Sequence, residues 1–185
     1  MSTANMLVEF LAIGVCACLW LLPILESAFP TALPTIGELG LEGLVLLAPA
    51  VYVLGAITNF LADRLLEPVD KRLRGSYGGK EAVRTAKARI LAHGGAAADY
   101  LLQRRSIVRI YRATVVNLGL FLLVMSMDVG GVASRWSLPS WEAVVVLAVA
   151  LAAATWAHVK TLDAYFAYVT RASDTIAAGL LDPKR

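Results

Sequence analysis

Four long apolar segments alternate with polar segments along the chain of 185 residues. Each apolar segment is close to the ~20 residues that a helix needs to cross a bilayer, and its ionisable residues lie near its ends. Pro23 and Pro49 fall inside two of these segments. We interpret them as kinks, because neighbouring helices satisfy the backbone groups that a proline frees. The pattern predicts four transmembrane helices, at about residues 7–28, 41–62, 113–132 and 141–159.

The polar segments also carry helical patterns. Residues 63–112 predict three helical pieces: a continuation of the second span, a helix at about 80–92, and a helix from Ala96 into the third span. Apolar residues recur at helical spacing after the fourth span and predict an amphipathic tail helix over 160–182; they are Leu162, Phe166, Val169, Ile176 and Leu180. The expected fold class is an all-α integral membrane protein, a single domain over 1–185. Its expected architecture is a four-transmembrane-helix bundle with cytoplasmic helical extensions.

The basic residues gather on one side of the predicted membrane. Twelve of the seventeen Lys and Arg residues lie in 64–112 and four in 160–185. The two connections on the other side of the predicted membrane, between the first and second spans and between the third and fourth, hold only Arg135. The positive-inside rule places the basic side in the cytoplasm. We therefore expect a multi-pass protein of a cell inner membrane, with both termini and the loop 63–112 in the cytoplasm.

The composition agrees with a membrane location. The chain is 58% hydrophobic and 17% charged, with a mean hydropathy of +0.68, whereas a soluble domain carries about 25% charged residues. These values exclude an ordinary cytosolic enzyme and a disordered regulator. The two cysteines, Cys16 and Cys18, lie two apart within an apolar segment, so they point to nearly opposite helix faces and are interpreted as packing residues.

No residue pattern for catalysis or metal binding emerges. The glycine turn before Lys80 lacks the spacing of a phosphate loop, and no strand precedes it. The histidines His93 and His158 are isolated, whereas metal sites need clustered ligands. His158 is expected at the inner headgroup level, with a protonation site as the alternative. Glu9 is expected to reach the interface rather than to lie buried. We expect no enzyme activity, no cofactor, no metal and no nucleic-acid partner.

Two charged regions are candidate sites. The outer ends of the spans carry five acidic residues, which either form a cation-attracting ring in an oligomer or simply flank the spans; they are Glu26, Glu38, Glu42, Asp128 and Glu142. The cytoplasmic loop has a surplus of basic residues. This surplus either only sets the topology or binds anionic membrane lipids, a nucleotide ligand or an acidic protein partner. Its candidate residues are Arg84, Lys87, Arg104 and Arg105.

A charge ladder is predicted between the second and third spans where they leave the membrane. The acidic residues Asp63, Glu67 and Asp70 recur at i, i+4 and i+7, and so do the basic residues Arg105, Arg109 and Arg112. Antiparallel helices would pair 63 with 112, 67 with 109 and 70 with 105. Asn59 and Asn117 would add a hydrogen bond one step deeper. Chance is the competing explanation, because Pro68 can bend the acidic stripe away.

A homo-oligomer is expected from two features. Small residues in the spans permit close helix approach; they are Gly14, Gly40, Gly43, Gly55, Gly119, Ala148 and Ala152. The apolar stripe of the tail helix would be partly exposed in a monomer and would seek a partner.

These features support two functional hypotheses. The first is a non-enzymatic, oligomeric sensor or scaffold of the bacterial inner membrane, which docks a cytosolic partner on its basic loop and tail helix. The alternative is an oligomeric pore-forming effector or cation channel that depolarises the membrane. In architecture alone, the chain resembles the small four-span proteins of bacterial antiphage systems such as Kiwa and the membrane effectors of nucleotide-signalled defence. This resemblance implies a role in stress or antiphage defence. No run of residues matches a family signature, so it assigns no site residues.

Overall fold

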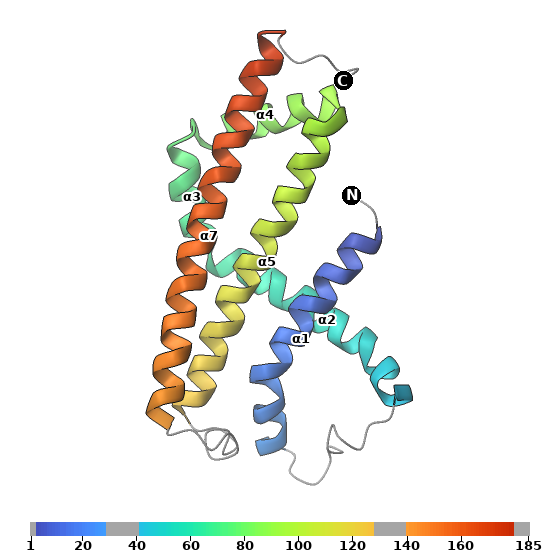
Figure 1. Cartoon of the computed structure of the whole chain (residues 1–185), viewed down its shortest axis with the longest axis vertical. Coiled ribbons are helices and arrows are strands. Elements are labelled where there is room, and N and C mark those ends of the chain that lie inside the picture. Colours follow the sequence, from blue (N-terminus) through green and yellow to red (C-terminus); the bar gives the residue numbers. More distant parts are fainter. Residues whose placement is uncertain (1–2, 29–40, 128–139, 180–185) are drawn as a thin grey trace.

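The computed structural model describes residues 3–28, 41–127 and 140–179, and nearly all of these residues lie in helices (Figure 1). The all-helical class predicted from the sequence is confirmed for this part of the chain, which contains no strand. The helices are α1 (Thr3–Ala28), α2 (Leu41–Leu65), α3 (Glu67–Gly75), α4 (Gly79–His93), α5 (Gly95–Ser126) and α7 (Ser140–Ala177).

Three helices of the described residues are long and apolar enough to cross a membrane. They contain the stretches Met6–Leu25 of α1, Gly95–Ser126 of α5 and Trp141–Ala177 of α7. These stretches overlap three of the four predicted spans. The remaining predicted span falls on α2, which is not among the three, so the four-span bundle stays a prediction.

Helices α1 and α2 touch through their backbones at two glycines. A Cβ atom added to Gly14 would lie 1.9 Å from the carbonyl oxygen of Val51, and one added to Gly55 would lie 1.9 Å from that of Phe10. Only glycine fits at such a crossing, which is the close approach that small residues permit in membrane helices. These two small residues therefore act within the chain, and they give no argument for an oligomer.

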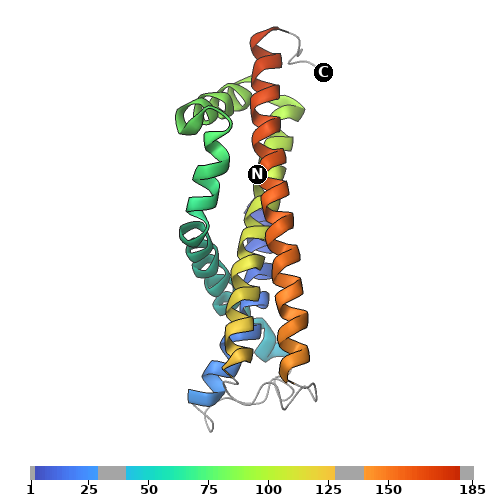
Figure 2. The same ribbon diagram turned by 90° about the vertical axis from the view of Figure 1, so that its left-hand side faces the viewer.

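Helices α5 and α7 form a long pair, and α3 and α4 cover the part of it that holds the start of α5 and the end of α7. The pair lies side by side in both views, with α3 and α4 on one flank (Figures 1 and 2). Val83 and Ile90 of α4 pack with the α7 residues Leu162, Phe166 and Val169 in the main apolar core. The α4 bounds are close to the helix expected at 80–92.

This packing corrects an expectation about the tail helix. Its apolar stripe was expected to be partly exposed in a monomer, but Leu162, Phe166 and Val169 are only 1%, 2% and 0% exposed. The reason is that α4 of the same chain covers the stripe. The argument for a homo-oligomer from this stripe is therefore removed.

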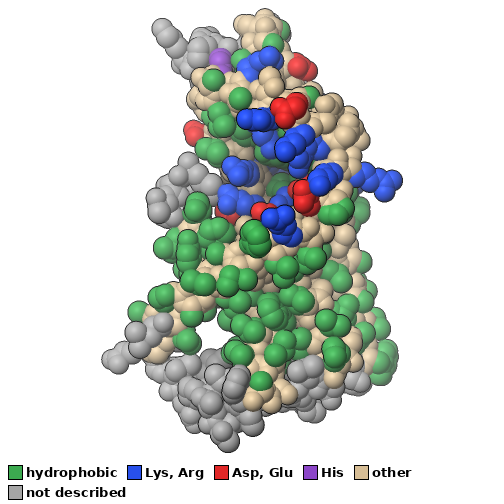
Figure 3. Space-filling model, turned by 180° about the vertical axis from the view of Figure 1, so that it is seen from behind, with side chains coloured by type: hydrophobic (Ala, Val, Ile, Leu, Met, Phe, Trp, Pro, Cys, Tyr) green, Lys and Arg blue, Asp and Glu red, His purple; other side chains and the backbone are tan. Residues whose placement is uncertain are grey.

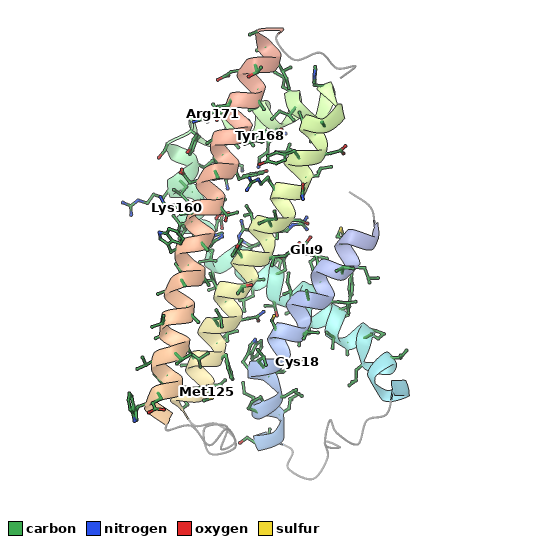
Figure 4. The ribbon with its side chains drawn as sticks, in the orientation of Figure 1. Glu9, Cys18, Met125, Lys160, Tyr168 and Arg171 are labelled. Carbon is green, nitrogen blue, oxygen red and sulfur yellow. The ribbon has the colours of Figure 1, made fainter. Side chains whose placement is uncertain are left out.

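Hydrogen bonds hold the covering helices on α7. The Tyr77 hydroxyl, in the turn before α4, donates to Asp163 Oδ1 at 2.6 Å. The Arg89 guanidinium of α4 donates to Ser173 Oγ at 3.0 Å. Within the pair, Tyr168 points from α7 towards α5 (Figure 4) and donates to the carbonyl oxygen of Ala97 at 3.0 Å. The α3–α4 segment is thus fixed at both ends of α4.

The glycine crossing gives a direct test of the packing. We expect Gly55→Ala to lower the stability of the detergent-solubilised protein by about 1–3 kcal/mol, because the new methyl group overlaps the Phe10 carbonyl and forces the helices apart. Gly119→Ala is the matched control, since a Cβ at Gly119 meets no atom within 4 Å. Thermal unfolding of the two variants measures the difference. Equal midpoints would show that α1 and α2 do not cross at Gly55.

Candidate functional site

A break between α2 and α3 sets the position of the acidic residues. Helix α2 ends at Leu65, and α3 starts at Glu67 with Pro68 in its first turn. Proline is well tolerated there because the first amides of a helix have no intrahelical partner. The change of direction alters which face each acidic residue occupies. Asp70 is turned inwards and is buried, whereas Asp63 remains exposed.

Arg112 of α5 connects the two helices on either side of this break. Its Nη1 atom pairs with Asp63 at the end of α2, and its Nη2 atom lies 2.6 Å from Asp70 Oδ2 in α3. The side chains of Arg112 and Asp70 are only 12% and 10% exposed. Burial raises the pKa of the Asp70 carboxyl, and the charge of Arg112 opposes that rise. One guanidinium thus pairs with two carboxylates at the junction of α2, α3 and α5.

A second ion pair joins α1 to α5 one turn away. Glu9 lies where α1 approaches α5 (Figure 4) and is 3% exposed. Its carboxylate accepts a hydrogen bond from the Ser106 hydroxyl and lies 3.3 Å from Arg109 Nε. The expectation that Glu9 reaches the interface is therefore wrong, because Ser106 and Arg109 supply a buried polar partner that its own helix lacks.

The predicted charge ladder forms in part and with different partners. The rung between Asp63 and Arg112 is present. Asp70 also pairs with Arg112 rather than with Arg105, and Glu67 pairs with Lys71 on its own helix at 3.0 Å. The break at Pro68 is the physical reason, because it turns Asp70 inwards and leaves Glu67 facing outwards.

The expected asparagine rung is replaced by contacts to α1. Asn117 accepts a hydrogen bond from Trp20 Nε1 at 3.0 Å and donates to the carbonyl oxygen of Ile13 at 3.2 Å. The Asn59 side-chain oxygen is buried without a hydrogen-bond partner among the described residues. Asn117 therefore fixes α1 against α5 instead of pairing α2 with α5.

His158 lies beside the same junction. It is 1% exposed, and its Nε2 atom is 3.9 Å from Asp70 Oδ1. Neither ring nitrogen has a hydrogen-bond partner in the part of the chain that the structure describes. The expected position at the inner headgroup level stays a prediction, and the structure adds that His158 of α7 is buried against Asp70 of α3.

A basic pocket opens above this junction, with a volume of about 220 Å³. Figure 3 shows Lys and Arg side chains gathered around a hollow, above a surface rich in hydrophobic side chains. Five basic residues line the pocket against two acidic ones; the basic residues are Arg74, Lys87, Arg105, Arg109 and Arg112 and the acidic residues are Asp63 and Asp70. Both acidic residues already pair with Arg112. The pocket is therefore strongly positive.

Three of the lining cations lack a carboxylate partner among the described residues: Arg74, Lys87 and Arg105. The Lys87 ammonium instead lies 4.8 Å from the Tyr165 ring centroid, over its face. Burial lowers the pKa of Lys87, and together with the nearby charges of Arg105 and Arg74 it brings that pKa from 10.5 to about 8. An anion entering the pocket would relieve this repulsion.

The structure divides the four anion-site candidates predicted from the sequence into two pairs. Lys87 and Arg105 line the basic pocket. Arg84 is exposed on α4 beside Glu81, and Arg104 donates to the Tyr100 hydroxyl on its own helix, so neither belongs to the pocket. The sequence did not single out Arg74, which reaches the pocket only because α3 folds back beside α5.

The predicted outer acidic ring lies largely outside the described residues. This applies to Glu38, Asp128 and the side chains of Glu26 and Glu42, whereas Glu142 is exposed in the first turn of α7. Among the residues that the structure does describe, no group of three His, Cys, Asp or Glu side chains is placed to hold a metal ion. The basic pocket is therefore the candidate site.

Comparison of the chain with protein-family models, with curated proteins and with solved structures found no match.

Removing the shared guanidinium should destabilise the fold. We expect Arg112→Met to lower the unfolding free energy by about 3 kcal/mol, because it leaves the Asp70 carboxylate buried without its cation. Lys71→Met is the matched control, since its pair with Glu67 is exposed to solvent and should contribute nothing measurable. Thermal unfolding in mild detergent compares the two variants. A similar loss in both would contradict the role of Arg112.

The lowered pKa of Lys87 predicts a pH-dependent stability. Folded Lys87 loses its proton near pH 8, whereas the unfolded chain keeps it to about 10.5. Between these values the unfolded state binds more protons, so the unfolding free energy should rise as the pH rises. Lys87→Met should abolish this rise, and Lys80→Met, at an exposed position of α4, should preserve it. Unfolding midpoints between pH 7.5 and 10.5, in ~0.5 steps, measure the slope. A rise that persists in Lys87→Met would assign it to another group.

Proposed function

We propose that this chain is a non-enzymatic, four-span protein of the bacterial inner membrane that acts as a receptor for a phosphate-type anion at its cytoplasmic face. Both termini and the α3–α4 segment lie in the cytoplasm in this proposal. The positive-inside rule supports that orientation, because sixteen of the seventeen basic residues fall on one side. The three apolar helices α1, α5 and α7 support the membrane location.

The observation that carries the proposal is the charge of the pocket. Arg74, Lys87 and Arg105 bring three positive charges to one cavity, and no carboxylate in the described part of the chain pairs with them. Guanidinium and ammonium groups are the side chains that bind phosphate in proteins, since they combine charge with several hydrogen-bond donors. The role proposed for the pocket is binding, and no reaction is assigned to it.

Binding in this pocket is coupled to helix pairing through Arg112. The same guanidinium lines the cavity and holds Asp63 and Asp70. An anion that draws on Arg112 competes with these carboxylates and weakens the contact of α5 with α2 and α3. A ligand shifts such an equilibrium by its difference in affinity for the two arrangements. The protein is thereby a sensor whose helices respond to an anion.

The exposed face of α4 is the surface that the proposal gives to a cytosolic partner. The inner face of α4 packs on α7 through Val83 and Ile90, so only its outer face, which carries exposed Arg84, is free to dock. The tail helix was expected to share this role, but α4 covers its apolar stripe. The partner surface is therefore narrower than the sequence indicated.

Binding of inorganic pyrophosphate tests the receptor proposal. Pyrophosphate should raise the unfolding midpoint of the solubilised protein above that in chloride at equal ionic strength, because a ligand that binds only the folded state stabilises it. The rise should be lost in Lys87→Met/Arg105→Met. The matched control is Arg84→Met/Arg104→Met, which removes the same two charges from α4 and α5 outside the pocket. An equal rise in all three proteins would contradict the proposal.

A further inference from the structure

The basic pocket begins where the apolar parts of the helices end. Asp63 directly follows the second span predicted from the sequence, at about 41–62, and Arg112 directly precedes the third, at about 113–132; both residues line the pocket. The other α5 residues of the lining extend to Arg105, about 10 Å further along the helix axis. The headgroup region on each side of a bilayer is roughly 5–7 Å thick. The end of the pocket that Asp63 and Arg112 form is thus at the level of the lipid phosphates.

An apolar surface leads up to the pocket along α2. Ile57 and Phe60 are 59% and 62% exposed, and Phe60 lies one helical turn before Asp63, on a neighbouring part of the same side. The Arg64 guanidinium lies over the Phe60 ring, 5.5 Å from its centroid. An amphiphile with its anionic group in the pocket therefore has an apolar surface beside it for its hydrocarbon part.

One buried donor of the lining also lacks a partner. Arg112 Nε is enclosed and has no hydrogen-bond partner among the described residues, although Arg112 lines the cavity. A buried donor without a partner is costly, and a bound oxygen acceptor would satisfy Arg112 Nε. The cavity of about 220 Å³ is several times the ~30 Å³ that one water occupies, so it has room for a phosphodiester.

We infer that the anion bound in this pocket is the headgroup phosphate of an anionic membrane phospholipid, with the acyl chains along the exposed face of α2. This inference rests on the proposed receptor function and names the source of its ligand. Arg105 and Lys87 hold the phosphate from α5 and α4, and Arg74 holds it from α3. Basic pockets between membrane helices on the cytoplasmic side are known to take anionic lipids in this way. The level of the pocket and the apolar surface beside it favour a lipid over a free phosphate compound.

Lipid titration with matched variants tests the inference. The detergent-solubilised protein is titrated with phosphatidylglycerol or with zwitterionic phosphatidylcholine, and native mass spectrometry counts the bound lipid. We expect selective binding of phosphatidylglycerol that is about 30-fold weaker in Lys87→Met/Arg105→Met, equivalent to about 1 kcal/mol for each charge. Arg84→Met/Arg104→Met should bind as the wild type does, and the charge-retaining Lys87→Arg/Arg105→Lys should restore most of the affinity.

The outcomes separate the lipid inference from the receptor proposal. Pyrophosphate stabilisation that depends on the pocket, without selective lipid binding, would overturn the lipid inference and leave the receptor proposal standing. Lipid binding that is equal in both double methionine variants would assign the lipid to the general positive surface and would also overturn the inference. If neither pyrophosphate nor phosphatidylglycerol binding depended on Lys87 and Arg105, both proposals would fall. The charge-retaining variant shows whether a loss reflects charge or misfolding.

Discussion

The arrangement of this protein depends on one buried guanidinium. Arg112 lies where α5 meets α2 and α3, and its two terminal nitrogens each hold a carboxylate. Enclosing these charges is tolerable only because they are paired, and the pairing requires Asp70 to face inwards. The break at Leu66 and Pro68 supplies that orientation. The pairs of Arg112 thus tie α3 to α5, and the apolar core then holds α4 on α7.

Local patterns in the sequence predict the helices but not their facing partners. The helix expected at about 80–92 lies close to the observed bounds of α4, whose buried residues are Val83 and Ile90. The pairing of Asp63 with Arg112 is also predictable, since both residues lie at the edge of apolar segments. The partners of Asp70 and Glu67 cannot be predicted in this way. A proline between two helical pieces rotates one piece relative to the other, and the spacing of residues in the sequence does not give the size of that rotation. Arg74 enters the site for the same reason.

Contacts between segments far apart in the sequence account for the other differences between the expectations from the sequence and the structure. A lone carboxylate near the end of an apolar segment, such as Glu9, suits either the interface or a buried ion pair, and its partners lie about a hundred positions away on α5. The stripe of the tail helix likewise indicates a covering partner without identifying it. The glycines Gly14 and Gly55 indicate close packing in the same way. In each case the partner is a segment of the same chain, and only the three-dimensional fold identifies it.

The charges of the pocket differ in what they contribute to binding. Arg74, Lys87 and Arg105 pair with no carboxylate of residues 3–28, 41–127 and 140–179. Their attraction for an anion therefore supplies affinity without breaking an ion pair of these residues. Arg112 does have such partners, so each interaction that it makes with a ligand is offset by one that it loses with Asp63 or Asp70. Affinity therefore comes mainly from the first three residues, and conformational coupling from the fourth. A ligand that reaches only Lys87 and Arg105 would bind without changing the helix pairing, whereas one that also engages Arg112 would bind and loosen the junction.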